Sequence, residues 1–282
     1  MLIRLAHSPD PDDAFMFYGL ACGAVPAGPY RFEHVLADIQ TLNDAALRGE
    51  YEVTALSIHA YPYVQARYAL MSCGCSMGDG YGPLLVTCVP RTVADLRGAT
   101  IAVPGLRTTA YLALQLLLGA DTFRPQVVMF DRICDEVAAG RVDAGLVIHE
   151  GQLTYARQGL HLVTDLGVWW QRTTGLPLPL GGNAIRRDLG AEHMGAITRL
   201  IRQSIQYGLD HRTEAVRHAL RYGRGLDEPL ADRFVGMYVN EWTLDYGARG
   251  REAVRRLLAE GAGRGLVPAA GDLEFVDASN PG

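Results

Sequence analysis

The sequence predicts an α/β protein of two lobes with a ligand site between them. At 282 residues the chain is about twice the ~150 residues of a typical domain, so we expect two units. Short apolar runs alternate with segments of helical character, as in α/β folds. Two of these runs end in the same dipeptide, Ile-His, at His59 and His149, which predicts a similar strand end in each lobe.

The composition excludes several classes of function. Hydrophobic residues make up 49% and charged residues 20%, as in an ordinary globular protein. The net charge of -5 offers no basic stripe for nucleic acid, so we expect a small-molecule ligand. All 26 Lys+Arg residues are arginines, and the absence of lysine excludes Schiff-base catalysis, a lysine-bound pyridoxal cofactor and a phosphate-loop lysine.

The five cysteines are odd in number and scattered, which argues against an extracellular disulfide framework. Cys73 and Cys75 form a close pair, but no second Cys/His pair follows at a zinc-site spacing, so we expect buried or idle thiols and no metal. The first strand is expected to begin at Leu2, without a signal peptide, and no apolar run approaches the ~18 residues of a membrane span. We therefore expect a cytoplasmic protein, and leave open whether it is a monomer or a homodimer.

The chain is expected to open with a strand over 2–6, a tight loop and a helix. Asp10 is expected to be the N-cap, with Pro11 at the first helical position and Asp12 and Asp13 complementing the helix dipole. We interpret Asp10 as a capping residue only. Asp13 is a candidate site residue because it can face the space above the sheet.

The first lobe is expected to continue with a strand within 31–39, a helix over 39–48 and a strand that ends at Ser57. Ser57, Ile58 and His59 follow the carboxyl end of that strand, where ligands bind in open α/β sheets. The alternative is that Ser57 or His59 caps a helix expected over 60–68.

The second lobe is expected to begin at the break near Val89 and Pro90. Its first strand, 100–103, leads through a loop to a helix over 111–118. Thr108 and Thr109 lie at that helix's N-terminus, where backbone N–H groups and hydroxyls form a generic anion and hydroxyl site. Alternatively, Thr108 or Thr109 only caps the helix.

His149 is the strongest candidate for chemistry. The uncharged run 144–148 between Gly140 and Gly151 predicts a buried strand, which places His149 and Glu150 at its carboxyl end. An imidazole, with a reference pKa of ~6.5, can act as a base near neutral pH. The alternative is a structural histidine at the start of a loop.

The rest of the chain is expected to return to the first lobe. Trp169 and Trp170 either cover a flat ligand or pack between domains. Residues 176–183, rich in proline and glycine, are expected to break regular structure at the crossing. We therefore assign residues 1–89 and 182–282 to one lobe and 90–181 to the other. Helices are expected over 194–209, 213–222, 229–239 and 251–260.

Several segments together resemble the 1,4-dihydroxy-6-naphthoate synthase family of the futalosine route to menaquinone. They are residues 8–15, 56–61, 78–84, 104–109, 148–151, 175–181 and 237–243. The family's usual opening is Ser-Pro-Cys-Pro-Asn-Asp. This chain has Asp10 and Asp12 in place of the cysteine and asparagine, and it retains Asp13.

The resemblance implies a type II periplasmic-binding-protein-like fold of two α/β lobes. It also implies a cofactor-independent lyase that cleaves cyclic dehypoxanthine futalosine to 1,4-dihydroxy-6-naphthoate and dihydroxyacetone. His149 matches the family's proposed proton acceptor, and the stretches from Ser57 to His59 and Thr108 to Thr109 match its substrate contacts. Glu150 is a further candidate to orient the imidazole, although adjacent side chains on an extended segment point apart.

Two alternatives remain at this stage. One is a solute-binding protein of the same fold, which would close on a ligand without changing it. The other is the enzyme that dehydrates chorismate in the same pathway. The Ile-His-Glu-Gly motif at 148–151 favours the synthase.

Overall fold

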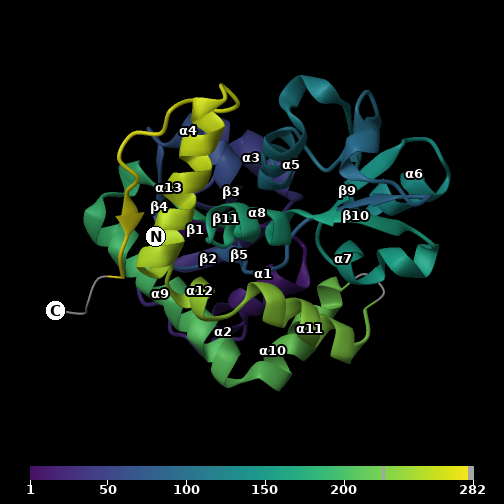
Figure 1. Cartoon of the computed structure of the whole chain (residues 1–282). Coiled ribbons are helices and arrows are strands. Elements are labelled where there is room, and N and C mark those ends of the chain that lie inside the picture. The colour runs from purple at the N-terminus through teal and green to yellow at the C-terminus, as the bar shows by residue number, and fades with distance from the viewer. Residues whose placement is uncertain (224–225, 279–282) are drawn as a thin grey trace.

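The computed structural model describes residues 1–223 and 226–278, which form two β-sheets with helices packed around them (Figure 1). The first sheet, on the left of Figure 1, has the order β12-β4-β11-β3-β1-β2, with β5 paired to β11. The second sheet, on the right, has the order β10-β6-β9-β7-β8. The expected α/β fold of two lobes is confirmed.

The strands of the first sheet are β1 Leu2–His7, β2 Arg31–Leu36, β3 Val53–Ser57, β4 Tyr68–Met71, β5 Ser76–Gly78, β11 Leu178–Arg186 and β12 Phe275–Val276. Those of the second sheet are β6 Leu84–Thr87, β7 Thr100–Val103, β8 Arg124–Val127, β9 Ala144–Val147 and β10 His161–Asp165. The α-helices of the described residues are α1 Pro11–Met16, α2 Tyr18–Ala21, α3 Ile39–Arg48, α4 Tyr61–Val64, α5 Thr109–Leu118, α6 Ile133–Ala138, α7 Gly151–Thr154, α8 Leu166–Thr174, α9 Ala191–Asp210, α10 Arg212–Ala219, α11 Glu228–Tyr238, α12 Glu241–Leu244 and α13 Gly247–Gly263.

The first sheet lies between two layers of helices. Alternate residues such as Ile3 and Val53 pack against α1 and the helices α9, α10 and α11, which lie below the sheet in Figure 1. Leu56 and Leu70 belong to the opposite face, covered in part by α13. This alternation follows from the two-residue period of a strand, which sends successive side chains to opposite faces.

The two lobes share one hydrophobic core. Leu56 from the first sheet belongs to the same cluster of buried residues as Ile101 and Leu146 from the second. The second sheet's other face is covered by α6, through Ile133 and Val137. The shared cluster therefore holds the strand ends of the two lobes against each other.

The chain changes sheet earlier than expected at both crossings. β6 belongs to the second sheet, although we assigned residues up to 89 to the first lobe. β11 belongs to the first sheet and begins at Leu178, before the expected return at 182. Both boundaries were placed at proline-containing stretches, but Val89 and Pro90 lie beyond β6, and Pro179 lies inside β11.

Residues 176–183 were wrongly expected to lack regular structure, since most of them belong to β11. Pro179 is tolerated because β11 pairs there with β5 alone, and its register shifts between Pro179 and Gly181. A proline without an N–H fits such a stretch, where a partner is missing on one side. The expected helix over 60–68 is also too long, since α4 ends at Val64 and Tyr68 opens β4.

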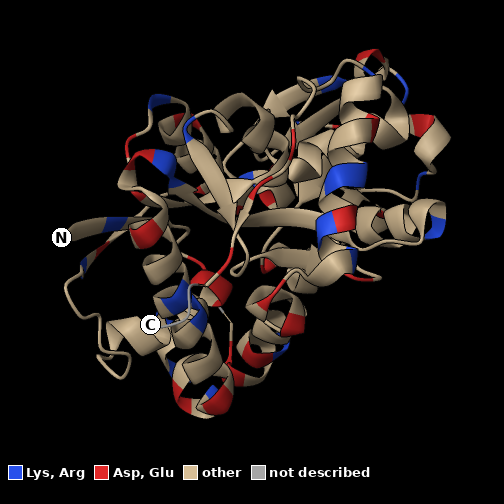
Figure 2. Cartoon of the chain, turned by 90° about the vertical axis from the view of Figure 1, so that its left-hand side faces the viewer, with Lys and Arg blue, Asp and Glu red and all other residues tan. Residues whose placement is uncertain are grey.

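The surface agrees with the sequence in its mixed charge. In the view of Figure 2, arginines and acidic residues are interspersed along the helices rather than gathered into one basic face. Among the helices of residues 1–223 and 226–278, none combines the length and the apolar character that a membrane span requires.

Candidate functional site

An open cavity lies between the two lobes. The first lobe contributes the loop after β1, the end of β3 and part of β11, and the second contributes the loops after β7 and β9. The described polar residues that line it are Ser8, Asp10, Asp12, Asp13, Ser57, Ser76, Thr108, Thr109, His149, Gln152, Asn183 and Tyr238. Its place beyond the carboxyl ends of parallel strands β1, β3 and β7 is the one that the sequence predicts.

His149 follows β9 on a backbone that few residues adopt. Its φ is 55°, and among the described residues it is the only non-glycine with a positive φ. A left-handed backbone costs a side-chain-bearing residue roughly 1–2 kcal/mol, so the surrounding packing must hold this conformation. Phe130 contributes to it with an edge-to-face contact, in which the two ring centroids are 4.7 Å apart.

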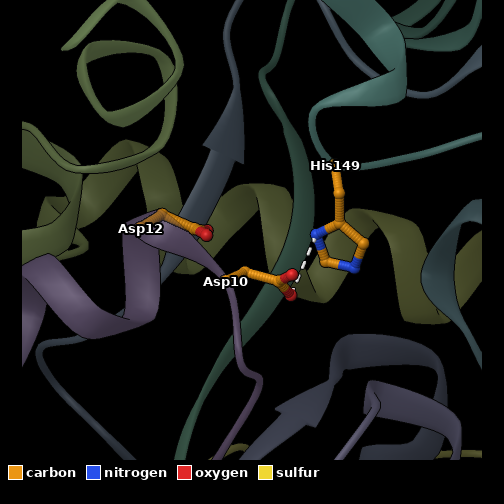
Figure 3. Close-up of side chains that lie close together, drawn as sticks. All are labelled: Asp10, Asp12 and His149. Carbon is orange, nitrogen blue, oxygen red and sulfur yellow. Dashed lines mark ion pairs between the residues drawn. The ribbon is translucent and has the colours of Figure 1, made fainter. Parts of the chain in front are cut away.

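Asp10 is the carboxylate that contacts this imidazole. Its Oδ2 atom lies 3.3 Å from Nδ1 of His149, and its side chain is fully buried (Figure 3). Nε2 of His149 has no hydrogen-bond partner among the described residues. Because a neutral imidazole carries one proton, a carboxylate beside Nδ1 favours the proton there and leaves the lone pair on Nε2.

This contact corrects the expectation that Asp10 is a capping residue only. Asp10 does occupy the N-cap position of α1 with an extended backbone, but its side chain makes no capping hydrogen bond. Glu150, the sequence's candidate to orient the imidazole, is buried next to His149 in the chain, and the carboxylate that lies at Nδ1 is that of Asp10. Pro11 at the first helical position is confirmed. The capping pattern was therefore sound for the backbone and misleading for the Asp10 side chain.

Asp12 and Asp13 follow on the first turn of α1 and are both buried. The Oδ2 atom of Asp13 accepts a hydrogen bond of 2.7 Å from the backbone N–H of Ser8. Burial, together with the neighbouring charge of Asp10, raises the pKa of Asp12 to about 6. Burial and the charges of Asp12 and Asp10 raise the pKa of Asp13 well above its ordinary value. Negative charge is therefore costly at this end of the cavity.

Ser57, Thr108 and Thr109 all line the cavity, from opposite lobes. Thr108 also caps α5, because its Oγ1 accepts from the N–H of Tyr111 at 3.3 Å and donates to the carbonyl of Gly105 at 2.9 Å. Thr109 donates its hydroxyl proton to the carbonyl of Leu180 at 2.5 Å. The capping interpretation of Thr108 is thus confirmed, and its substrate contact stays a prediction.

Asn43 fixes the position of Ser57. Its Nδ2 donates to Oγ of Ser57 at 3.0 Å, and its Oδ1 accepts from the backbone N–H of Ser57 at 2.9 Å. The Ser57 oxygen thereby accepts a bond from inside the protein, and its own proton remains available for a ligand.

Ile58 and His59 do not line the cavity, although the sequence placed them in the site. Ile58 is fully buried in the core. His59 lies behind the wall, where its Nδ1 is 3.0 Å from the carbonyl of Thr108 and its N–H donates to Oγ1 of Thr109 at 3.2 Å. Burial lowers the pKa of His59, so the ring is neutral near pH 7. Its place in the structure is that of a support for Thr108 and Thr109.

Polar contacts also join α3 to the loop that follows β7. The N–H of Arg107 donates to Oε1 of Gln40 at 3.0 Å, and its guanidinium donates to Asp44 at 2.9 Å. Both charged side chains are about 40% exposed, at 39% and 41%, so the ion pair adds only ~0.2–1 kcal/mol. The hydrogen bond from the backbone N–H of Arg107 to Gln40, together with the shared core, holds the two lobes at this distance.

Sequence reasoning missed Asn183 and Gln152. Asn183 lies in β11 with 1% of its surface exposed, and its Nδ2 has no hydrogen-bond partner among the described residues. Gln152 accepts a 2.6 Å hydrogen bond from the hydroxyl of Tyr238. No local pattern points to Asn183, because its neighbours in the cavity come from distant segments, and Gln152 follows His149 closely in the chain without a signal of its own. Trp169 and Trp170 do not line the cavity, and Trp170 is packed in the core with its indole N–H bonded to the carbonyl of Pro177 at 3.2 Å.

The two sheets and the cavity between them define a periplasmic-binding-protein-like fold, with an Asp–His pair in the cavity. Solved structures of similar shape include the alkanesulfonate-binding protein SsuA from Xanthomonas axonopodis bound to MOPS, with a TM-score of 0.72, 14% identity and coverage of 95% of this chain and 94% of that one. A protein from Archaeoglobus fulgidus has a TM-score of 0.90 and 46% identity, over 94% of this chain and 98% of its own.

Residues 3–262 match the sequence profile of a family described as "Menaquinone biosynthesis", and the chain belongs to this family. A relative from Thermus thermophilus named 1,4-dihydroxy-6-naphtoate synthase is 45% identical, over 94% of this chain and 96% of the relative. A relative of the same name from Streptomyces coelicolor is 42% identical, over 95% and 96%.

Proposed function

We propose that this protein is a 1,4-dihydroxy-6-naphthoate synthase, a lyase that releases dihydroxyacetone from cyclic dehypoxanthine futalosine. The names of the two relatives support the activity, since both cover nearly the whole chain at 42% and 45% identity. The observation that carries the mechanism is the Asp10–His149 pair in the cavity, with Nδ1 on the carboxylate and Nε2 without a protein partner.

In this mechanism His149 is the general base. Nε2 removes a proton from the substrate, and the Asp10 carboxylate stabilises the imidazolium that forms and holds the ring in one tautomer. A positioned base of this kind contributes ~10²–10⁴ to the rate. The carbon–carbon bond then breaks towards a carbonyl of the substrate, which accepts the electron pair, and the aromatic product supplies much of the driving force.

The protein also has to hold the substrate in place. The chain has no lysine, so an iminium cannot serve as the electron acceptor and the reacting carbonyl must be oriented directly. Ser57 and Asn183 provide O–H and N–H donors on the wall of the cavity. A buried donor without a partner costs about 1–3 kcal/mol, which a substrate oxygen at Asn183 would recover on binding.

The test is turnover of the pure protein. Incubation with cyclic dehypoxanthine futalosine should give 1,4-dihydroxy-6-naphthoate and dihydroxyacetone in equal amounts by mass spectrometry, and a parallel incubation with chorismate should show no loss of water. The His149→Asn variant serves as the control for contaminating activity. Binding of the substrate without products would instead make the protein a receptor, and dehydration of chorismate would assign it to the other enzyme.

A further inference from the structure

Three potential metal ligands converge at the end of the cavity. They are a carboxylate oxygen of Asp10, a carboxylate oxygen of Asp12 and a ring nitrogen of His149, and these atoms lie within 4.8 Å of one another (Figure 3). Within residues 1–223 and 226–278, no other group of three His, Cys, Asp or Glu side chains comes together in this way. Two ligands come from the loop and helix after β1 and the third from the loop after β9, so the group forms only between the lobes.

A second observation points to a ligand at this place. Asp12 has 9% of its surface exposed, and its Oδ1 has no hydrogen-bond partner among the described residues. In Figure 3 its carboxylate points towards the space beside the Asp10–His149 contact. A buried carboxylate oxygen without a donor is costly, and a cation at that position would remove the cost.

We propose that Asp10, Asp12 and His149 bind a divalent transition-metal ion, such as Zn²⁺ or Co²⁺, and that the ion switches off His149 as a base. Metal–nitrogen and metal–oxygen bonds of ~2.0–2.2 Å place two ligands of one ion about 3–3.5 Å apart, and Asp10 and His149 are 3.3 Å apart. The carboxylate oxygen of Asp12 lies within 4.8 Å of the other two ligand atoms, so it has only a short distance to move to become the third ligand. An imidazole ligand favours these ions over Mg²⁺ and Ca²⁺, which prefer oxygen alone.

The inhibition follows from the proton count of the imidazole. A neutral imidazole has one proton and one lone pair. If the ion takes the lone pair at Nδ1, the proton must sit on Nε2, which then cannot accept another from the substrate. The metal and the Nδ1 proton therefore compete for the same atom, and the metal-bound form has no base. This inference goes beyond the proposed function, because the binding step involves no substrate.

The first experiment measures binding alone. Tag-free, metal-stripped protein is titrated with Co²⁺ while the visible absorption of the bound ion is followed, and with Zn²⁺ by calorimetry. We expect one ion per chain in the wild type. Asp12→Asn should weaken the affinity more than tenfold, since changes even to residues behind the ligands cost ~10–100-fold. The controls Asp121→Asn and His161→Asn, both exposed and remote from the cavity, should bind like the wild type.

Circular dichroism shows whether Asp12→Asn is folded. A folded variant with lower affinity for the ion supports the site. Wild-type affinity in a folded Asp12→Asn variant, or the absence of a one-to-one complex in the wild type, would overturn the site. The second experiment adds Zn²⁺ to the turnover assay, where activity should fall with the fraction of protein bound and return with a chelator. Full activity of the saturated protein, or activation by the ion, would overturn the switch, whereas failure of turnover without metal would count against the proposed function only.

Discussion

Nδ1 of His149 lies 3.3 Å from Oδ2 of Asp10, and the two residues belong to different lobes. Asp10 follows β1 in the first sheet, and His149 follows β9 in the second. Neither lobe alone contains the pair, so the contact depends on the core that the sheets share. In the proposed mechanism, catalysis therefore depends on the packing of the lobes against each other.

Replacing His149 by asparagine should lower kcat by about 10²–10⁴ and change KM little, because it removes the base and keeps a polar side chain of similar reach. Steady-state kinetics with the cyclic substrate measure both constants. The exposed His161, replaced in the same way, is the matched control and should keep wild-type values. Near-full activity of His149→Asn would rule out the proposed base.

Replacing Asp10 by asparagine should also lower kcat, by about 10² within the ~10²–10⁴ range of a positioned base, because the amide no longer stabilises the imidazolium. A positioning role predicts a change in kcat with KM largely kept. Asp10→Glu retains the charge and should recover part of the activity. Because asparagine has the same size as aspartate, near wild-type kcat in Asp10→Asn would mean that the charge of Asp10 does not support the base.

Replacing Asn183 by alanine should raise KM by several-fold to about tenfold, since a hydrogen bond contributes ~0.5–1.5 kcal/mol and 1.4 kcal/mol is a factor of ten. The fold should not lose stability, because Nδ2 of Asn183 has no partner among the described residues. Kinetics and thermal unfolding together separate the two effects. A loss of thermal stability with KM unchanged would make Asn183 a structural residue.

Replacing Thr108 by valine should destabilise the protein by about 1 kcal/mol, because Oγ1 of Thr108 caps α5. A change of that size lowers the Tm of a chain of this length by roughly 2–4 °C. We also predict a several-fold rise in KM, since Thr108 lines the cavity. Thr108→Ser keeps the hydroxyl and should preserve both quantities. A lower Tm with an unchanged KM would leave Thr108 as a cap alone.

The position of His149 at the cavity could be predicted from the sequence, because the evidence for it is local. An uncharged run that ends in Ile-His predicts a strand and its carboxyl end. Because ligands bind beyond the carboxyl ends of the strands in open α/β sheets, His149 is then expected at the cavity. The same reasoning failed for His59, although its strand also ends at the cavity. His59 points behind the wall, and the direction of a side chain after a strand depends on one or two backbone angles that the pattern does not contain.

The sequence did not predict the contact of Asp10 with His149 or the place of Asn183 at the cavity, and the reasons differ. The Asp10-Pro11 pair is a strong helix-start signal, so a second role for the Asp10 side chain was hidden by an adequate local explanation. Asn183 lies in a stretch whose prolines and glycines indicate a loop, yet β3 and β5 pair with it as a strand. In both cases tertiary contacts decided the outcome and outweighed the local signal.

Asp12 should reduce stability at neutral pH, and its replacement by asparagine should therefore stabilise the protein there. Burial raises the pKa of Asp12 to about 6 from an ordinary value of 3.8, so between these values the folded state binds more protons than the unfolded state. By linkage, the free energy of unfolding then falls as the pH rises through this window and stays lower above it. Asp10 and Asp13 share the charge of this cluster, so we expect a gain on the order of 1 kcal/mol for Asp12→Asn, below the ~3 kcal/mol of two full pKa units.

Urea unfolding at pH 8 and near pH 4 measures this gain. The difference between Asp12→Asn and the wild type should be largest at pH 8 and much smaller near pH 4, where the folded-state carboxyl is neutral and the unfolded-state carboxyl is close to its ordinary pKa of 3.8. The exposed Asp121→Asn is the matched control and should show no such trend. A gain that did not depend on pH would mean that the amide acts through new contacts, and a loss of stability at pH 8 would mean that the Asp12 charge is compensated in the folded protein. If Asp12→Asn both raises the free energy of unfolding at pH 8 and lowers the affinity for Co²⁺, then one carboxylate destabilises the fold and binds the ion.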